Sequence, residues 1–194
     1  QVEQALARPV TRSLTVTDAG WFPAASGHRM RRAHGVQETI VLLCVSGGGF
    51  VSFAGETHVL SAGTGIVIPA GVTHEYRASD TAPWTIWWLH ARGSDVGDLT
   101  SPLAGGSSPL LQPRSLDRIV ALFDELVAML ERRMSPAQLL AVSGTATHLL
   151  TRLIADSVLP ADGSPLERAM RYLEARVDGS IRIGELAAIV QMST

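Results

Sequence analysis

A change of hydrophobic pattern near residue 110 constrains this chain more than any other feature of its sequence. Before it, short apolar runs alternate with turns rich in glycine and proline; after it, apolar residues recur at steps of three and four. Many short strands at regular spacing are typical of an all-β barrel or sandwich, whereas the second pattern is typical of amphipathic helices. We therefore predict a β domain over residues 1–110, followed by helices.

The β domain is expected to consist of short strands joined by tight turns. Apolar residues on either side of Gly55, at 51–53 and 57–59, predict a hairpin. The stretch 93–113 is rich in Gly, Ser and Pro and is predicted to be a loop. The apolar runs that predict strands are 39–45, 50–53, 58–60, 66–68, 74–77 and 84–90.

The helical region is expected to begin at Ser115, which is placed to cap a first helix, and to continue with a second that has Pro136 at its start. The predicted helices span 116–134, 137–159, 166–177 and 183–190. We predict that residues 111–159 form a helix pair for packing and dimerisation. Residues 160–165, Pro-Ala-Asp-Gly-Ser-Pro, are then a linker to the segment 166–194.

Composition and charge exclude several classes of protein. With 46% hydrophobic and 18% charged residues, the chain is neither disordered nor fibrous. Its formal net charge of −2 excludes a basic surface for nucleic acid over the whole protein. No apolar run approaches the ~18 residues of a membrane helix, so no membrane partner is expected. A single cysteine, Cys44, excludes an intramolecular disulfide and favours a reducing, cytoplasmic location.

One motif narrows the choice of β fold. Gly63, Pro69, Gly71 and His74 are spaced as G-x5-P-x-G-x2-H. Such a strand begins at a glycine turn and ends at a Pro-x-Gly turn, which returns His74 toward the mouth of a barrel. The spacing resembles the second motif of the cupin superfamily, although an ordinary hairpin also accounts for the glycines and the proline.

A metal-binding cupin also needs a first motif with two histidines and a glutamate. Counting back from Gly47, the glutamate position falls on Ile40, and at most His34 occupies a histidine position. His34 and His74 provide two ligands, whereas a catalytic metal needs about three from the protein. We therefore predict no metal, no cofactor and no catalytic residue. A stand-alone cupin metalloenzyme, a dioxygenase or isomerase, is the alternative.

Longer stretches resemble bacterial transcription regulators of the AraC family. They are Arg32-Ala33-His34-Gly35 and residues 46–49, 55–60, 68–76 and 84–90. The resemblance implies a mainly β fold with α: a cupin-like double-stranded β-helix barrel, two long helices and a truncated helix-turn-helix segment. It also implies an effector-responsive transcription regulator, not an enzyme, whose barrel binds a small molecule and controls DNA binding.

The segment 166–194 resembles the start of that family's DNA-binding domain. The matching positions are Leu166, Ala169, Tyr172, Leu173, Ile183, Leu186, Ala187 and Met192-Ser193. Because the match ends where the first recognition helix would begin, we expect an incomplete N-terminal part of the helix-turn-helix domain. Operator DNA is then a partner of the full-length protein only.

The resemblance also indicates an effector site inside the barrel. In a small barrel alternate residues of a strand point inward, and the resemblance places Trp84, Ile86, Trp88 and His90 inside. Trp88 is then a stacking platform and Arg32 a hydrogen-bond donor to the ligand. Ile86 stands where sugar-binding members carry a polar residue, which favours a less polar effector. The predicted ligand-binding residues are Arg32, His74, Tyr76, Trp88, Ile86 and Trp21, the last as part of an arm.

The helix pair has two interpretations. It either covers the barrel or forms the contact of a homodimer, for which the resemblance indicates Leu122, Leu126, Met129 and Leu130. A third interpretation of the whole chain is a degenerate sensor that binds no ligand. Its barrel would be filled by its own side chains and would serve as a dimer scaffold.

Overall fold

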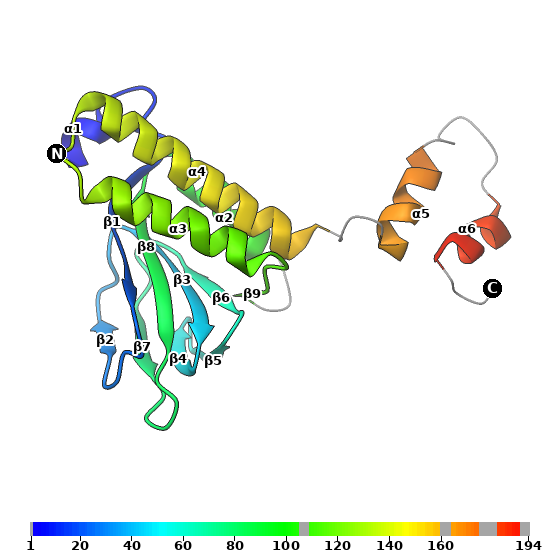
Figure 1. Cartoon of the computed structure of the whole chain (residues 1–194), viewed down its shortest axis with the longest axis horizontal. Helices are drawn as coiled ribbons and strands as arrows, with labels where there is room; N and C mark the ends of the chain where they lie inside the picture. The colour runs from blue at the N-terminus through cyan, green and yellow to red at the C-terminus, as the bar shows by residue number, and fades with distance from the viewer. Residues whose placement is uncertain (1, 105–108, 160–163, 175–181, 191–194) are drawn as a thin grey trace. The chain divides into compact units, whose positions relative to one another are not determined.

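The computed structural model describes residues 2–104, 109–159, 164–174 and 182–190. It divides into two compact units, residues 1–157 and residues 158–194. The first contains all the strands that the structure describes, together with four helices (Figure 1). The second contains two short helices.

The first unit is built on two antiparallel sheets, which confirms the predicted cupin-like fold. One has the order β1-β8-β3-β6-β9 and the other the order β2-β7-β4-β5. The strands of the first sheet are β1 (Thr15–Phe22), β8 (Thr85–Arg92), β3 (Thr39–Ser46), β6 (Gly65–Ile68) and β9 (Leu110–Leu111). Those of the second are β2 (Arg29–Arg32), β7 (His74–Ala78), β4 (Gly48–Phe53) and β5 (Glu56–Ser61).

The turns follow the glycine pattern of the sequence. Between β6 and β7, Gly71 has a φ of +77°, in the left-handed region that favours glycine, and the turn delivers His74 as the first residue of β7. The predicted hairpin joins β4 to β5, with Phe53 paired to Glu56. Its two turn residues, Ala54 and Gly55, both have positive φ, as a two-residue type I′ turn requires.

The first sheet separates two apolar clusters, because successive residues of a strand point to opposite faces. On β8, Ile86 belongs to the cluster inside the barrel, whereas Trp87 and Leu89 belong to the cluster on the outer face. The inner cluster also contains Trp84, which precedes β8 and is fully buried. The predicted division of this strand into inward and outward residues is confirmed.

Helices cover the outer face of the first sheet. α3 (Leu116–Leu130) and α4 (Pro136–Val158) lie side by side along it, and Phe123 and Leu149 pack with Leu89 in the outer cluster (Figure 1). Two further helices, α1 (Val2–Leu6) and α2 (Val96–Ala104), were not predicted. α2 and β9 lie in the stretch that the sequence predicted to be a loop. α2 contains Gly97 and Pro102, which give it a poor local helix signal.

A buried carboxylate joins the two long helices. Asp156 is 4% exposed and accepts a hydrogen bond from the backbone N–H of Ser115 at 2.6 Å. Arg152 donates to the same carboxylate at 3.4 Å. Ser115 is the N-cap residue of α3, but its side chain makes no capping hydrogen bond. The start of α3 is therefore capped by a residue of α4 rather than by Ser115 itself.

The second unit contains α5 (Pro165–Glu174) and α6 (Ile183–Val190). The hydroxyl of Tyr172 donates to Glu185 at 2.6 Å, and Arg168 donates to the carbonyl of Ile189 at 3.1 Å, so the two helices are joined by side-chain hydrogen bonds. Most of the predicted linker, residues 160–163, and the turn at Met192-Ser193 lie outside the described residues. Among the helices that the structure describes, none has the length and apolar character needed to cross a membrane.

Candidate functional site

The candidate site lies inside the barrel, where polar side chains from both sheets meet. On the second sheet, Arg32 at the end of β2 is paired with His74 at the start of β7, and Tyr76 follows on the same face. On the first sheet, Trp88 of β8 is paired with Leu42 of β3. We call the region that these inward-facing side chains occupy the lumen. Its polar groups come from strands that are far apart in sequence but adjacent in the sandwich.

A glycine makes room for the lumen tryptophan. Gly20 of β1 is paired with Trp88, and a Cβ atom at this position would lie 2.8 Å from Cζ2 of the indole ring. That distance is shorter than van der Waals contact, so any larger residue would displace the ring. Gly20 therefore positions Trp88 against the strand.

Aromatic rings line the lumen in a continuous series. Trp88 packs on His90, with ring centroids 5.2 Å apart, and on Phe22 at 5.6 Å. Phe22 in turn contacts His28 at 4.9 Å, and His28 lies 5.7 Å from Tyr76. The series surrounds the polar groups with ring faces and edges, which favours a ligand with a flat or apolar part.

Three polar atoms in the lumen are buried without a hydrogen-bond partner in the described part of the chain. They are Nε of Arg32, Nε2 of His74 and Nε1 of Trp88. A buried polar group left unpaired costs about 1–3 kcal/mol, and native proteins contain few of them. By contrast, the indole N–H of Trp84 is paired, since it donates to Nδ1 of His28 at 3.2 Å. The unpaired atoms thus belong to Arg32, His74 and Trp88, whereas Trp84 has its polar group satisfied within the chain.

Hydrogen bonding and burial define the chemistry of these groups. Nδ1 of His74 lies 2.8 Å from the carbonyl oxygen of Val72. In a neutral ring that donates there, Nε2 carries a lone pair and is an acceptor. Burial lowers the pKa of His28, and it lowers the pKa of His90 although Asp18 and Glu38 oppose it. These two rings are therefore held toward their neutral forms.

The pKa values of Tyr76 and Cys44 are raised, in contrast to those of His28 and His90. Burial raises the pKa of Tyr76, while the nearby Arg32 charge acts against this shift. Burial also raises the pKa of Cys44 to about 11, so its thiol is protonated and a poor nucleophile. The lumen therefore combines the cationic Arg32 with two histidines, His28 and His90, that burial holds toward their neutral forms.

The structure brings most of the predicted site residues together. Arg32, His74, Tyr76, Ile86 and Trp88 all face the lumen. Their role in ligand binding stays a prediction, which this arrangement supports.

Trp21 is placed differently. It is not part of an arm but belongs to β1, and it stacks on the outward-facing Trp87 with ring centroids 5.9 Å apart. It is 49% exposed. Because Trp21 and Phe22 are neighbours in a strand, only one of them faces the lumen, and that one is Phe22.

Three lumen residues were not among the predicted ligand-binding residues: Phe22, His28 and His90, the last of which had been predicted to lie inside the barrel. For two of them, the alternation of inward and outward side chains along a strand indicates a position in the lumen. His90 shares the inward face of β8 with Trp88, and recognition of β1 as a strand would have separated Phe22 from Trp21. His28 precedes β2, and its position depends on a turn that the sequence pattern does not specify.

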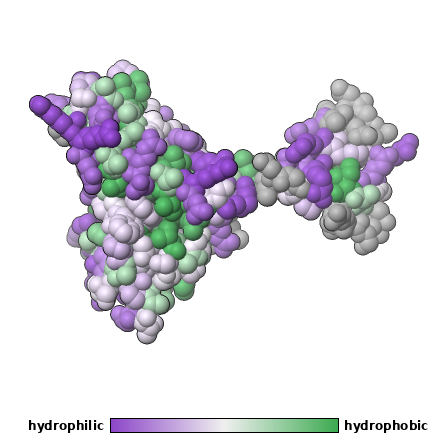
Figure 2. Space-filling model, in the orientation of Figure 1, coloured by the Kyte–Doolittle hydropathy of each residue, from purple (hydrophilic) through white to green (hydrophobic). Residues whose placement is uncertain are grey.

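The predicted dimer residues pack within the chain. Leu126 is fully buried in the outer cluster and has no surface to offer a partner. Leu122, Met129 and Leu130 are partly buried against the same cluster. The largest exposed apolar side chain on α4 before its last turn is Leu140, at 48%. On the visible face of the first unit, apolar side chains form separate spots among polar ones (Figure 2).

The structure also shows what stands at the cupin metal positions. Ile40, at the position of the glutamate, is buried in the inner cluster and paired with His90. Among the described residues, no group of three or more His, Cys, Asp or Glu side chains is arranged to hold a metal ion.

Comparisons with known proteins agree with this geometry. The family described as AraC-like ligand binding domain matches residues 22–159. The MmsAB operon regulatory protein of Pseudomonas aeruginosa is 24% identical over 196 residues, covering 99% of this chain and 64% of that protein. The lactose operon transcription activator of Staphylococcus xylosus is 33% identical over 60 residues, covering 31% of this chain and 22% of that protein.

The crystal structure of the AraC-like transcriptional activator CuxR is similar at 14% identity and a TM-score of 0.48, covering 87% of this chain and 64% of that chain. The chain thus spans less than two thirds of the length of the curated relatives it matches.

Proposed function

Because the chain belongs to the family of AraC-like ligand binding domains, we propose that it is the sensor part of a transcription regulator and that the barrel lumen is its effector site. The family consists of ligand-binding regulator domains rather than enzymes. The metalloenzyme alternative is therefore set aside. The observation that carries the proposal is that three inward-facing residues, Arg32, His74 and Trp88, each have a buried polar atom without a hydrogen-bond partner in the described part of the chain.

These atoms define the chemistry of a matching ligand. Arg32 Nε and Trp88 Nε1 are N–H donors, and Nε2 of His74 is an acceptor in the tautomer whose Nδ1 donates to the Val72 carbonyl. A complementary ligand accepts two hydrogen bonds and donates one. A small carboxylic acid with a hydroxyl group meets this requirement, since its carboxylate accepts from Arg32 and Trp88 while its hydroxyl donates to His74.

The rest of the lumen favours an apolar body for such a ligand. Ile86 is fully buried beside the polar groups, and Phe22 stacks on Trp88 at an interplanar angle of 28°. An aliphatic or aromatic carbon skeleton fits against these surfaces, whereas a polyhydroxylated sugar would leave hydroxyl groups unpaired. A less polar effector agrees with the expectation drawn from Ile86 in the sequence.

The position of Phe22 favours a second candidate, the self-filled scaffold. Its ring is 41% exposed and covers one face of Trp88. In a sensor, Phe22 turns aside when the ligand enters. In a scaffold, it fills the lumen permanently. Phe22→Ala separates the two, because a sensor would keep or improve its affinity for the acid, whereas a scaffold would gain no affinity and would only lose packing.

The proposed output is a change in DNA binding by the full-length protein. Both curated relatives carry names that describe operon regulation. We assign DNA binding to the helix-turn-helix domain that begins in the second unit with α5 and α6. Effector binding would favour one arrangement of a homodimer that associates through the helical layer, and the shift in population would alter operator affinity.

Thermal unfolding of the chain in the presence of matched acid pairs tests the effector proposal. The pairs are lactate and propionate, 3-hydroxybutyrate and butyrate, and salicylate and benzoate. A ligand at about 100 times its Kd stabilises a protein by ~2.7 kcal/mol, which raises the Tm of a chain of this size by several degrees. We expect at least one hydroxy acid to raise the Tm more than its partner without the hydroxyl.

The control is His74→Phe, which retains a ring that can stack on Tyr76, 6.0 Å away in the native protein, but removes the acceptor. This variant should lose the preference for the hydroxylated acid. Equal shifts for both members of every pair, or a preference that survives in His74→Phe, would contradict the proposed ligand class.

A further inference from the structure

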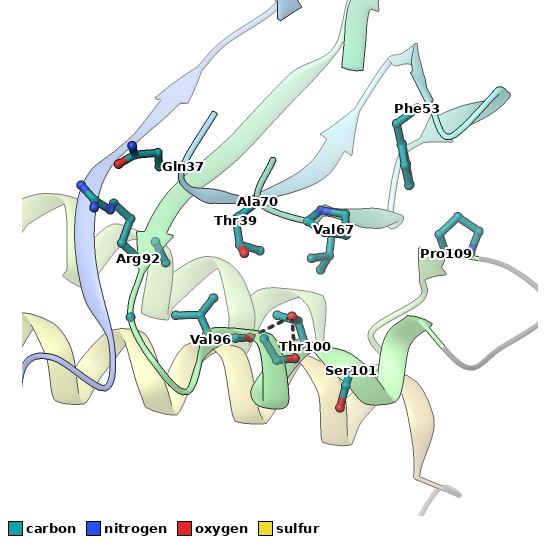
Figure 3. A pocket seen from close by; sticks show the side chains of 14 residues that line it. Gln37, Thr39, Phe53, Val67, Ala70, Arg92, Val96, Thr100, Ser101 and Pro109 are labelled. Carbon is teal, nitrogen blue, oxygen red and sulfur yellow. Dashed lines mark hydrogen bonds between the residues drawn. The ribbon is translucent and has the colours of Figure 1, made fainter. Parts of the chain in front are cut away.

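A cavity lies outside the lumen, between the first sheet and α2 (Figure 3). It has a volume of about 560 Å³, which is within the range of small-molecule sites. Thr39, Val67 and Ala91 form its ceiling, and these residues alternate with Ile40, Ile66 and His90, which face the lumen. Phe53 reaches the cavity from β4 of the second sheet, but none of the ligand-binding residues predicted for the lumen lines it, so the inference does not depend on the function proposed for the lumen.

The lining of this cavity is polar at one end and apolar at the other. In Figure 3, Gln37 and Arg92 lie together at one end, and Phe53 and Pro109 lie at the other. Val67 lies in the ceiling between these two ends. This polarity matches a ligand with one charged group and an apolar chain.

Two features make the polar end suitable for an anion. Of the described residues that line the cavity, Arg92 is the one with a charged side chain. α2 begins at Val96, which lines the cavity with Gly97, so the partial positive charge of the helix N-terminus adds to that of the guanidinium, although Asp98 in the first turn opposes it. Thr39 is 6% exposed, and its hydroxyl makes no hydrogen bond to the other lining residues (Figure 3).

The present partner of Arg92 is easily replaced. Arg92 Nη1 donates to Oε1 of Glu3 at 3.2 Å, and the Glu3 side chain is 81% exposed. An ion pair with an exposed carboxylate contributes little, because water and salt compete with it. A ligand carboxylate that also buries an apolar chain has the advantage over Glu3 at this position.

We propose that this cavity binds a monocarboxylate with an apolar chain, whose head group replaces Glu3 on Arg92 and whose chain lies against Val67 and Phe53. Glu3 belongs to α1, so binding releases the contact that joins α1 to β8. The site would thus report a second class of metabolite, larger and less polar than the hydroxy acid assigned to the lumen.

Calorimetric titration of the chain with sodium octanoate tests the head-group contact. Arg92→Gln should weaken binding at least ~10-fold, as the loss of a charge-assisted hydrogen bond does. Glu3→Gln removes the competing carboxylate and should strengthen binding up to ~5-fold. Octanol, which has the chain without the charge, should bind the native protein much more weakly than octanoate. Unchanged affinity in Arg92→Gln would overturn the proposal.

Gly97→Leu tests the location. Gly97 lines the cavity, and a Cβ atom there meets nothing within 4 Å, so a larger side chain starts in open space at the cavity wall and is expected to compete with the ligand. Leucine also has a higher helix propensity than glycine, which protects the fold. The matched control is Gly144→Leu on α4, where a Cβ atom likewise meets nothing and which does not line the cavity.

Octanoate binding should be lost in Gly97→Leu and retained in Gly144→Leu. Any response to hydroxy acids should be retained in both, so failure of this proposal is distinguishable from failure of the lumen assignment. Octanoate affinity that survives in Gly97→Leu, or that is lost in Trp88→Ala but not in Arg92→Gln, would place the acid elsewhere and overturn the proposal.

Discussion

The two faces of the first sheet, built from the same strands, have opposite chemistry. The outer face packs Leu89 and Ala91 against Phe123 of α3, and these side chains are almost completely buried. The inner face also contains buried apolar residues, but its Trp88 has a buried, unpaired Nε1, and the second sheet opposite it carries two more such atoms, on Arg32 and His74. On β8 the two kinds of residue alternate. The part of the outer face that packs on α3 therefore stabilises the fold, while the inner face tolerates an unpaired group that is suited to a ligand.

The largest effect is expected on the outer face. Phe123→Ala should lower the free energy of unfolding by about 3–5 kcal/mol, because it removes a fully buried ring from the contact between helix and sheet. Urea unfolding followed by circular dichroism measures the change. A loss below ~1 kcal/mol would mean that the helical layer does not stabilise the barrel. The contrast between a stabilising outer face and a ligand-binding inner face would then be wrong.

The second prediction concerns a polar group that is buried and fully paired. Asp156→Ala should cost about 1–3 kcal/mol, since it leaves the Ser115 N–H and Arg152 without their acceptor. Asp156→Asn keeps one acceptor oxygen and should lose less. If the two variants were equally stable, the carboxylate would not be the cap of α3.

The third prediction concerns a polar group that is buried and unpaired. Trp88→Phe keeps a ring in the lumen but removes the orphan N–H. Loss of packing and relief of the unpaired group oppose each other, so the free energy of unfolding should change by less than ~1.5 kcal/mol. The same variant should respond more weakly to hydroxy acids. A loss as large as that of Phe123→Ala would show that Trp88 acts mainly in stability.

The smallest effect is expected from pH. His28 and His90 have pKa values below 6.5 in the folded chain, so the unfolded chain binds more protons in that range. Their contribution to stability is complete above pH 6.5 and is lost as the pH falls through the folded pKa values. Unfolding curves between pH 7.5 and pH 5 measure the slope, which should be shallower in His28→Gln. A stability that rises on acidification would contradict the assignment of neutral rings.

Most of the fold could be predicted from the sequence, because turns and strand alternation depend on residues that are close together in the chain. Glycine at Gly71 and Gly55 fixes turns, and alternation along β8 correctly separated Trp88 from Trp87. α2 was missed since Gly97 and Pro102 weaken any helical pattern, and its formation depends on Val96 packing against the barrel. Such a contact is tertiary and leaves no periodic trace in the sequence.

The candidate site was predicted in part for the same reason. Arg32, His74 and Trp88 could be located from strand alternation and from resemblance, but their unpaired atoms became visible only in three dimensions. Trp21 was misplaced because the strand that contains it was taken for an arm. An amphipathic stripe such as that of α3 does not show whether it faces a partner or its own barrel, which is why Leu126 was assigned to a dimer contact.

The most direct test of the lumen as the effector site uses the indole N–H signals of the four tryptophans in a nitrogen-15 NMR spectrum. Trp84 and Trp88 face inward, whereas Trp21 and Trp87 stack on the outer face. The signal of Trp88, assigned by its loss in Trp88→Phe, should move most when a hydroxy acid that stabilises the chain is added, because its N–H gains an acceptor. Movement of the Trp21 and Trp87 signals with no change at Trp88 would place the ligand outside the lumen and contradict the account.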